Sequence, residues 1–372
     1  MQSASPMEKL DIKILFVTVG SIRHNASIIR AVHLGNELQR KGVGVGILLL
    51  DCSANRQYLA DCGYAGRILW TKKKLFIEKH VLHAINTGGY SYIHSINANL
   101  RVALLYMFRL VKPLLISDWD EMLSSNNNPL FRKLLYNTTE YIHLHYAGFI
   151  VTASVELQTL VLRKTEKNVY YLPYAMRGHA TTAPSTNEKF RLLYLGSFSH
   201  LYANDIVELL NLSLIAVQQE GELHILGEGA MLQRLRDGLT DAAISRVFFH
   251  GYVTQDRVDE IINGLGISTC FLPLENTDSN RYRCPNKLFH YMKTNRPIVT
   301  CAVGEAFNIL KDSGIYYDYG DRESLSAAVE RSKTWMTVYN SAAHTWQARA
   351  DEYIQIVNKF EANRKRQPIL KE

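Results

Sequence analysis

The chain is poor in the residues that mark disulfide-rich, zinc-binding and membrane-spanning proteins. Its five cysteines are scattered, odd in number and form no CxxC pair. The sequence therefore predicts neither a disulfide framework nor a zinc site, and a reducing compartment such as the cytosol fits. The longest apolar stretch, residues 101–116, is interrupted by Arg109 and Lys112, and residues 1–13 lack the apolar core of a signal peptide. No membrane span and no secretion signal are predicted.

Length, composition and charge describe a globular protein with a basic first half. The chain has 372 residues, of which 47% are hydrophobic and only nine are proline, so two domains with real cores are expected. Residues 1–178 carry 21 Lys and Arg against 12 Asp and Glu, whereas residues 179–372 carry 21 against 23. A basic domain can hold an anionic partner or lie on an anionic membrane surface. A solvated basic surface without a partner is the alternative.

Short apolar strands alternate with amphipathic helices along both halves of the chain. Strands are expected at Lys13–Val19, Val43–Leu50, Arg67–Thr71, Tyr92–Ile96, Leu114–Ser117, Phe149–Thr152, Leu192–Leu195, Glu222–Leu226, Arg246–Phe249, Ile267–Leu272 and Ile298–Cys301. This alternation predicts an α/β fold with mostly parallel sheets, whose ligands gather at the carboxyl ends of the strands. The polar segment Arg177–Lys189 lacks periodicity and is the expected linker. From Arg322 to about Asn363 the pattern predicts helix.

Residues 280–305, NRYRCPNKLFHYMKTNRPIVTCAVGE, combine cationic side chains, a helix start and a strand. Pro285 suits the first turn of a helix, and the residues after it continue at helical spacing into an apolar face. Arg281, Arg283 and Lys287 would lie beside the positive end of that helix. Such a place favours a phosphate or diphosphate.

Seven stretches, taken in this order, resemble GT-B glycosyltransferases of the retaining family 4 type, also called glycosyl transferases group 1. They are KILFVTVG, YLPYAM, LLYLGSFS, LHILGEG, VFFHGYV, FLPL and PNKLFHYMKTNRPIVTCAVGE. The resemblance spans essentially the whole chain, and the last stretch is the most specific. It implies two Rossmann-like domains facing each other across a cleft. Residues 1–178 would bind the acceptor, residues 179–345 the nucleotide-sugar, and the helix in 346–372 would cross back to the first domain.

The resemblance also implies a set of donor-binding residues in the second domain. Gly196 and Ser197 would form the turn against the diphosphate, where a glycine lets the backbone approach phosphate oxygens. The other implied donor contacts are Gly227, Glu228, Tyr252, Pro285, Asn286, Leu288 and His290. The alternative is that these glycines only form ordinary turns between a strand and a helix.

The chain departs from the family pattern at its cations and acids. The usual Arg and Lys after the first turn are replaced by residues 198–204, so Arg281, Arg283 and above all Lys287 are the expected diphosphate contacts. A solvent-facing lysine is the alternative at position 287. The family's two glutamates, eight residues apart, correspond to Tyr282 and His290, and His290 either hydrogen-bonds a ribose hydroxyl or only packs on the helix.

In the first domain, Gly20 and Ser21 follow the first strand, where the resemblance implies contact with the sugar and the acceptor. Asp118 and Asp120 follow another strand and are expected to face the cleft and to bind acceptor or donor hydroxyls, with helix capping as the alternative. The DxD-like spacing of Asp118 and Asp120 also suggests a metal site. The resemblance argues against it, because it implies an enzyme that works without a metal ion. We therefore expect no metal and no cofactor, with Lys287, Arg281 and Arg283 stabilising the departing diphosphate.

Two segments of the basic half invite a membrane interpretation. Residues 70–79 combine Trp70 with a run of lysines, and residues 101–112 are apolar with basic ends; an ordinary surface helix and a buried helix are the alternatives. No nucleic-acid-binding motif is found.

The function implied is transfer of a hexose-type sugar, with retention, in glycan, polysaccharide or glycolipid synthesis. The acceptor would be a glycan, a lipid-linked group or a small molecule, and the protein cytoplasmic or peripheral on the inner face of the membrane. A nucleotide-sugar-binding protein without turnover and a nucleotide-sugar epimerase are the alternatives.

Overall fold

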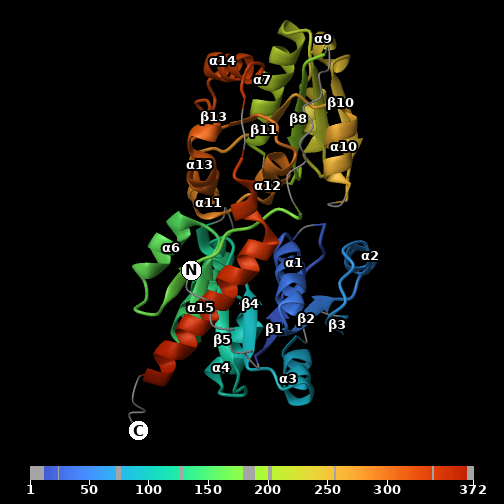
Figure 1. Ribbon diagram of the computed structural model, residues 1–372. Coiled ribbons are helices and arrows are strands. Elements are labelled where there is room, and N and C mark those ends of the chain that lie inside the picture. Colours follow the sequence, from blue (N-terminus) through green and yellow to red (C-terminus); the bar gives the residue numbers. More distant parts are fainter. Residues whose placement is uncertain are drawn as a thin grey trace, which may run out of the picture.

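Two parallel sheets, one above the other in Figure 1, organise the chain. The computed structural model describes residues 12–23, 25–72, 77–125, 129–178, 189–199, 203–254, 257–336 and 339–366. In both sheets every strand pairing is parallel. The expected α/β fold with two Rossmann-like halves is confirmed.

The first sheet has the strand order β3-β2-β1-β4-β5-β6-β7. Its strands are β1 (Lys13–Val17), β2 (Gly44–Leu50), β3 (Arg67–Thr71), β4 (Tyr92–Ile96), β5 (Leu114–Trp119), β6 (Ala147–Thr152) and β7 (Val169–Tyr171). The helices of this half are α1 (Ser27–Arg40), α2 (Ser53–Asp61), α3 (Ile77–Gly88), α4 (Leu100–Met107), α5 (Leu130–Tyr146) and α6 (Val155–Leu162). Apolar side chains fill both faces of this sheet, as expected for parallel strands buried on both sides.

The second sheet has the order β10-β9-β8-β11-β12-β13. Its strands are β8 (Arg191–Leu195), β9 (Glu222–Leu226), β10 (Val247–Gly251), β11 (Thr269–Leu272), β12 (Ile298–Thr300) and β13 (Ile315–Tyr316). The helices are α7 (Asp205–Gln218), α8 (Leu232–Asp237), α9 (Asp241–Ile244), α10 (Val258–Gly264), α11 (Asp278–Tyr282), α12 (Asn286–Lys293), α13 (Gly304–Leu310), α14 (Arg322–Ser332) and α15 (Trp346–Arg366). In both sheets the order reverses beside the first strand, which opens a crevice at the carboxyl ends.

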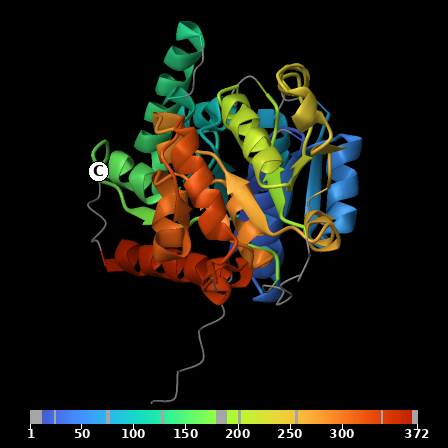
Figure 2. The ribbon, with the colours of Figure 1, turned by 90° about the horizontal axis from the view of Figure 1, so that it is seen from above.

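The C-terminal helix α15 crosses back to the first sheet, as expected from the resemblance (Figure 1). The crossing begins where Met176 and Trp346 pair through their backbones, with Trp346 N donating to Met176 O at 3.3 Å. Further along α15, the Tyr353 hydroxyl lies 2.8 Å from Nδ1 of His94 in the first sheet. Together α1 and α15 cover one face of this sheet, and α5 lies on the opposite side (Figure 2).

The two halves also meet through α6, α11 and α13. Ser154 Oγ donates to the Tyr282 carbonyl at 2.7 Å, and the Val155 amide donates to Glu305 Oε2 at 2.9 Å. The Tyr171 hydroxyl donates to the other oxygen of Glu305, whose side chain is buried. These contacts hold α11, which leads into α12, against the first domain.

The sequence prediction was wrong at three places. The continuous helix from Arg322 is broken, because the chain leaves α14 and docks the Tyr339 hydroxyl on the Arg296 carbonyl at 2.8 Å before α15 begins. The stretch YLPYAM, which begins at Tyr171 and was expected to be the strand before the linker, leaves the sheet after Tyr171 at the end of β7, and the short strand β13 was not expected. Among the described residues, no helix is long and apolar enough to cross a bilayer.

Candidate functional site

Three loops interlock at the carboxyl ends of β8, β9 and β10. The Gly196 amide donates to Leu226 O at 3.0 Å, Phe198 N donates to Glu228 O at 3.0 Å, and Gly227 N donates to Gly251 O at 2.7 Å. Ser197, in the first loop, and Glu228, in the second, are exposed. The sequence-predicted residues Gly196, Ser197, Gly227 and Glu228 are therefore brought together at one edge of the second sheet.

Gly227 is required by this close approach. Its φ is +143°, and a Cβ built there would lie 1.8 Å from the Gly196 carbonyl oxygen. We expect Gly227→Ala to destabilise the protein by at least about 2 kcal/mol, because both strain and collision must be relieved. Urea unfolding would measure the loss. Gly264→Ala is the matched control, since its Cβ meets nothing within 4 Å; equal unfolding midpoints for the two variants would contradict the argument.

Helix α12 begins at Asn286 with Pro285 as its N-cap, beside the β8 loop. Tyr291 fixes this position, because its hydroxyl accepts from Leu195 N at 2.8 Å and donates to Phe271 O at 3.2 Å. Leu288 is fully buried in the core and so packs the helix rather than facing a ligand; Pro285 is buried as well. The side chains of Pro285 and Leu288, which were expected to contact the donor, are therefore not exposed.

Lys287 lies in the first turn of α12 and is half-buried. Its Nζ sits 4.5 Å from the centre of the Tyr194 ring, whose hydroxyl donates to Asp205 Oδ2 at 2.9 Å. Burial lowers the pKa of Lys287 to about 8; Asp205 opposes the shift and the positive charge of Arg283 adds to it. The two cations Lys287 and Arg283 thus lie close enough to repel each other, which favours an anion between them.

Arg281 stands apart from this pair. It lies on α11, is 43% exposed and forms an ion pair with Asp278 at 2.5 Å. Tyr282, the next residue, packs against the apolar core of the first domain. The loop before α12 therefore brings the charge of Arg283 close enough to lower the pKa of Lys287, while Arg281 is held by an acid of its own helix.

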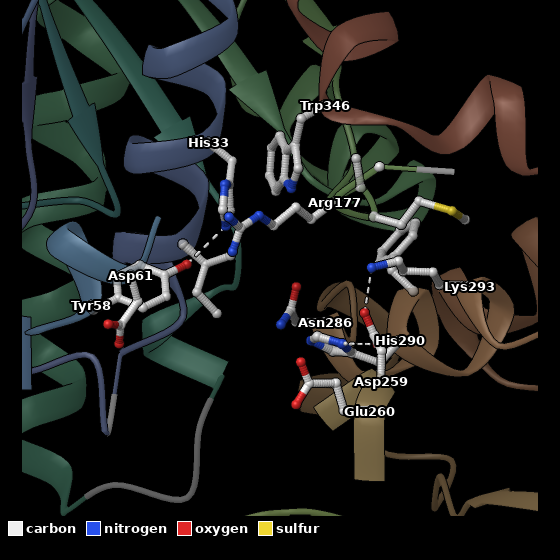
Figure 3. Close-up of a pocket in the computed structure, with 15 residues that line it drawn as sticks. His33, Tyr58, Asp61, Arg177, Asp259, Glu260, Asn286, His290, Lys293 and Trp346 are labelled. Atoms are coloured by element: carbon white, nitrogen blue, oxygen red, sulfur yellow. Dashed lines mark hydrogen bonds and ion pairs between the residues drawn. The ribbon is translucent and has the colours of Figure 1, made fainter. Parts of the chain in front are cut away.

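A cavity of about 420 Å³ opens between the two domains beside α12 (Figure 3). His290 and Asn286 line it, and His290 Nδ1 lies 3.3 Å from Asp259 Oδ1 on α10. Lys293 forms an ion pair with the same carboxylate. Burial alone would raise the pKa of Asp259, but the hydrogen bonds and charges of His290 and Lys293 lower it. The predicted residue at position 290 thus faces a cavity and is oriented by an acid.

The opposite wall of the cavity comes from the first domain and the crossing segments, and its residues were not predicted. His33 of α1 stacks on Trp346 with ring centres 5.8 Å apart, and its Nε2 lies 2.9 Å from the Tyr58 hydroxyl. Arg177 reaches toward them in Figure 3. Burial, with the charges of Arg177, His290 and Lys293, lowers the pKa of His33 to about 3, so this histidine is neutral. Nothing local in the sequence connects these residues, because they come from four separate segments.

The loop after β1 holds Gly20 and Ser21 at the same edge of the first sheet. Buried Asn55 fixes it, donating to Gly20 O at 2.9 Å and accepting from Ile22 N at 2.8 Å. In the same loop the Arg23 guanidinium lies 5.4 Å from the Tyr252 ring centre, across the cleft. The predicted acceptor loop and the predicted Tyr252 therefore face each other.

Asp118 and Asp120 do not face the cleft as expected. Asp118 is fully buried, and its Oδ2 binds Arg30 Nε at 2.5 Å and His94 Nε2 at 2.8 Å. Asp120 Oδ2 accepts from Ser27 Oγ at 2.7 Å and from the Tyr174 hydroxyl at 2.8 Å, and burial raises the pKa of this acid. The expectation fails because α1 packs directly over the end of β5.

The DxD-like spacing of these two acids does not assemble a metal site. Among the described residues, no group of three or more His, Cys, Asp and Glu side chains could hold a metal ion.

The lysine run considered above for a membrane surface falls largely on residues 73–76, which lie outside the described residues.

Comparisons with known proteins agree with this architecture. Residues 189–332 match the family model described as glycosyl transferases group 1. Sucrose-phosphate synthase from Thermosynechococcus elongatus matches with a TM-score of 0.70 at 14% identity, covering 95% of this chain and 100% of that one. Anabaena Alr3699/HepE, solved with UDP and glucose, matches with a TM-score of 0.69 at 12% identity, over 94% and 100%.

A third similar structure is the lipopolysaccharide outer core galactosyltransferase WaaB, with a TM-score of 0.62 at 12% identity, covering 95% of this chain and 100% of that one. No curated protein sequence matches the chain. The GT-B fold and the resemblance to glycosyl transferases group 1 are confirmed. The family match supports glycosyl transfer and covers the domain that carries α12.

Proposed function

We propose that this protein is a retaining glycosyltransferase that moves a hexose-type sugar from a nucleoside diphosphate to a hydroxyl acceptor. The observation that carries the proposal is the cationic start of α12, where Lys287 and Arg283 lie beside the Gly196 loop inside the matched region. A helix N-terminus flanked by cations suits a diphosphate. Since Alr3699/HepE was solved with UDP and glucose, uridine donors are the first to test.

The proposed mechanism assigns charge stabilisation to the protein. Lys287, Arg283 and the α12 dipole would stabilise the diphosphate as it departs. Arg281 would contribute only after exchanging its Asp278 partner. The acceptor hydroxyl would approach from the Gly20 and Ser21 loop, and the leaving phosphate itself would take its proton. No protein base is assigned.

His290 and Asn286 would bind the nucleoside end of the donor in the cavity beside α12. The Asp259 carboxylate lies at Nδ1 of His290, so Nε2 is the ring nitrogen that would meet a ribose hydroxyl. A hydroxyl both donates and accepts hydrogen bonds, so it can pair with Nε2 of an imidazole or of an imidazolium. One imidazole nitrogen replaces the two oxygens of the family's glutamate here, so we expect one ribose contact instead of two.

Activity should depend on pH through Lys287. Its pKa of about 8 in the free enzyme means that the cation is present below pH 8 and is lost as the pH rises through that value. We expect kcat/KM for the donor to fall about tenfold per pH unit above pH 8. The limb in kcat should lie at higher pH, because a bound diphosphate raises the pKa of the lysine.

Lys287→Arg is the control for this assignment, since a guanidinium stays protonated across the range. Its kcat/KM is expected to remain level between pH 7 and about 10 if the introduced guanidinium still reaches the diphosphate. An alkaline limb that persists unchanged in active Lys287→Arg would assign the titration to another group.

The test of the function is product analysis with several nucleotide sugars and simple hydroxyl acceptors. We expect the α-linked nucleotide sugar to yield an α-linked product, read by proton NMR, together with free nucleoside diphosphate. An inverted product would remove the retaining assignment. Binding of the donor with neither transfer nor hydrolysis would support the binding-protein alternative, and a changed sugar still attached to its nucleotide would support the epimerase.

The basic first domain supports an anionic acceptor. A glycan or lipid-linked group carrying phosphate or carboxylate would complement the excess of 21 Lys and Arg over 12 Asp and Glu in residues 1–178. A role in polysaccharide or glycolipid synthesis at the inner face of a membrane is proposed on this ground. Small hydroxyl acceptors are the competing class in the same assay.

A further inference from the structure

The first half of α5 exposes large apolar side chains to solvent. Leu130 is 84% exposed, Phe131 76% and Leu134 64%, and Tyr141 is 69% exposed about two turns beyond them. Residues 130–138 are exposed or half-buried throughout, and burial begins at Thr139. In Figure 2 this helix projects outward from the side of the first domain. Large contiguous apolar surfaces of this kind mark interaction sites.

The exposed half of α5 is amphipathic. At 100° per residue, Leu130, Phe131 and Leu134 fall on one arc of the helix, together with Leu135 and Tyr141. Arg132 and Lys133 fall on the remaining side. Between Pro129 and Thr139 the chain carries these two cations and no acid. A helix with an apolar arc and a cationic flank is the pattern of helices that lie in a lipid interface.

The second half of α5 anchors this surface on the first domain. It packs beside β5, where His143 Nδ1 lies 2.8 Å from Ser117 Oγ and Nε2 lies 3.1 Å from Asn99 O. Ser117 is near the carboxyl end of β5, so the second half of α5 is anchored at that end of the strand, and the first half projects outward from the side of the domain (Figure 2). The apolar arc therefore lies on the domain that would hold an acceptor.

We propose that residues 130–135 of α5 dock this protein on an anionic lipid surface, with the apolar arc inserted and Arg132 and Lys133 at the headgroups. Charge complementarity selects lipid over a second copy of the chain. A second copy would place the same cations, on the same basic domain, against each other. The proposal does not depend on glycosyl transfer and locates a surface that the basic sequence segments did not identify.

Vesicle co-sedimentation of the full chain tests the proposal. We expect binding to vesicles of equal parts phosphatidylcholine and phosphatidylglycerol, and little binding to phosphatidylcholine alone. Phe131→Ser with Leu134→Ser should weaken binding at least about tenfold, because both side chains lose their apolar burial. Arg132→Gln with Lys133→Gln should also weaken it about tenfold and reduce its sensitivity to salt.

The matched control is Val207→Ser with Ile244→Ser, at apolar positions of the second domain that are 54% and 58% exposed. This variant should bind as the wild type does, and circular dichroism should show all variants folded. Wild-type protein that ignores both kinds of vesicle would overturn the proposal. So would a wild-type dimer in light scattering that Phe131→Ser with Leu134→Ser converts to monomer, because a second copy would then cover the arc.

Discussion

Lys287→Ala is expected to lower kcat/KM for the nucleotide sugar about 100-fold while leaving the protein folded. Loss of one preorganised donor to a developing oxyanion costs about this much in other enzymes. The side chain is half-buried above the Tyr194 ring and carries none of the apolar packing of α12, which comes from Leu288, Phe289 and their neighbours. Steady-state kinetics with the preferred donor would measure the change.

Lys333→Ala is the matched control for this prediction. Lys333 also lies over an aromatic ring of the second domain, with its Nζ 5.3 Å from the centre of Phe190, but at the opposite end of β8. Its removal should leave kcat/KM within about twofold of the wild type, as expected for a surface change away from the cleft. A Lys287→Ala enzyme with unchanged kinetics and a normal melting curve would show that another cation holds the diphosphate.

Arg30→Met should produce the largest loss of stability. Arg30 is fully buried, and its guanidinium donates to Asp118 Oδ2 at 2.5 Å, to Leu172 O at 2.7 Å and to Pro173 O at 3.2 Å. Removal of Arg30 leaves the Asp118 charge buried, with His94 as the remaining ion-pair partner among the described residues, and such losses cost about 3–5 kcal/mol. Urea denaturation, followed by circular dichroism, would measure the shift.

Arg40→Met on the same helix is the control for this prediction, because it removes an ion pair that is exposed instead of buried. Arg40 also pairs with an acid at 2.5 Å, Glu37, but its side chain is 71% exposed, so the expected loss is below about 1 kcal/mol. The double change Arg30→Met with Asp118→Asn should recover part of the stability, because no uncompensated charge remains. Equal unfolding midpoints for Arg30→Met and the wild type would mean that this buried network contributes little.

Elements with strong local signals were predictable. The apolar runs of β3, β4 and β9 gave the observed bounds, because the chain around them carries turn residues and the strands are rich in apolar side chains. The start of α12 was predictable for the same reason, since Pro285 and the cations beside it lie within one short segment. The break before α15 was not, because it depends on docking Tyr339 against Arg296, 43 positions away.

The acids at the end of β5 show where local reasoning fails. Asp118 is the penultimate residue of the strand and Asp120 follows it, so both look like cleft residues, but their partners Arg30 and Ser27 come from α1, 88 and 93 positions earlier. Similarly, His33 and Arg177 reach the cavity beside His290 only because the two domains and the crossing segments meet there. Charge type and strand position do not reveal such pairings, since they are set by tertiary packing.

Binding of nucleoside diphosphates, measured as a thermal shift of the wild type and of Lys287→Ala, tests the central claim that the start of α12 is a diphosphate site. A ligand that binds only the native state at about 100 times its Kd adds about 2.7 kcal/mol of stability. We predict that one diphosphate, with UDP as the first choice, raises the melting temperature of the wild type and has a much smaller effect on Lys287→Ala. If no nucleoside diphosphate stabilises the wild type, or if both proteins respond equally, the claim is contradicted.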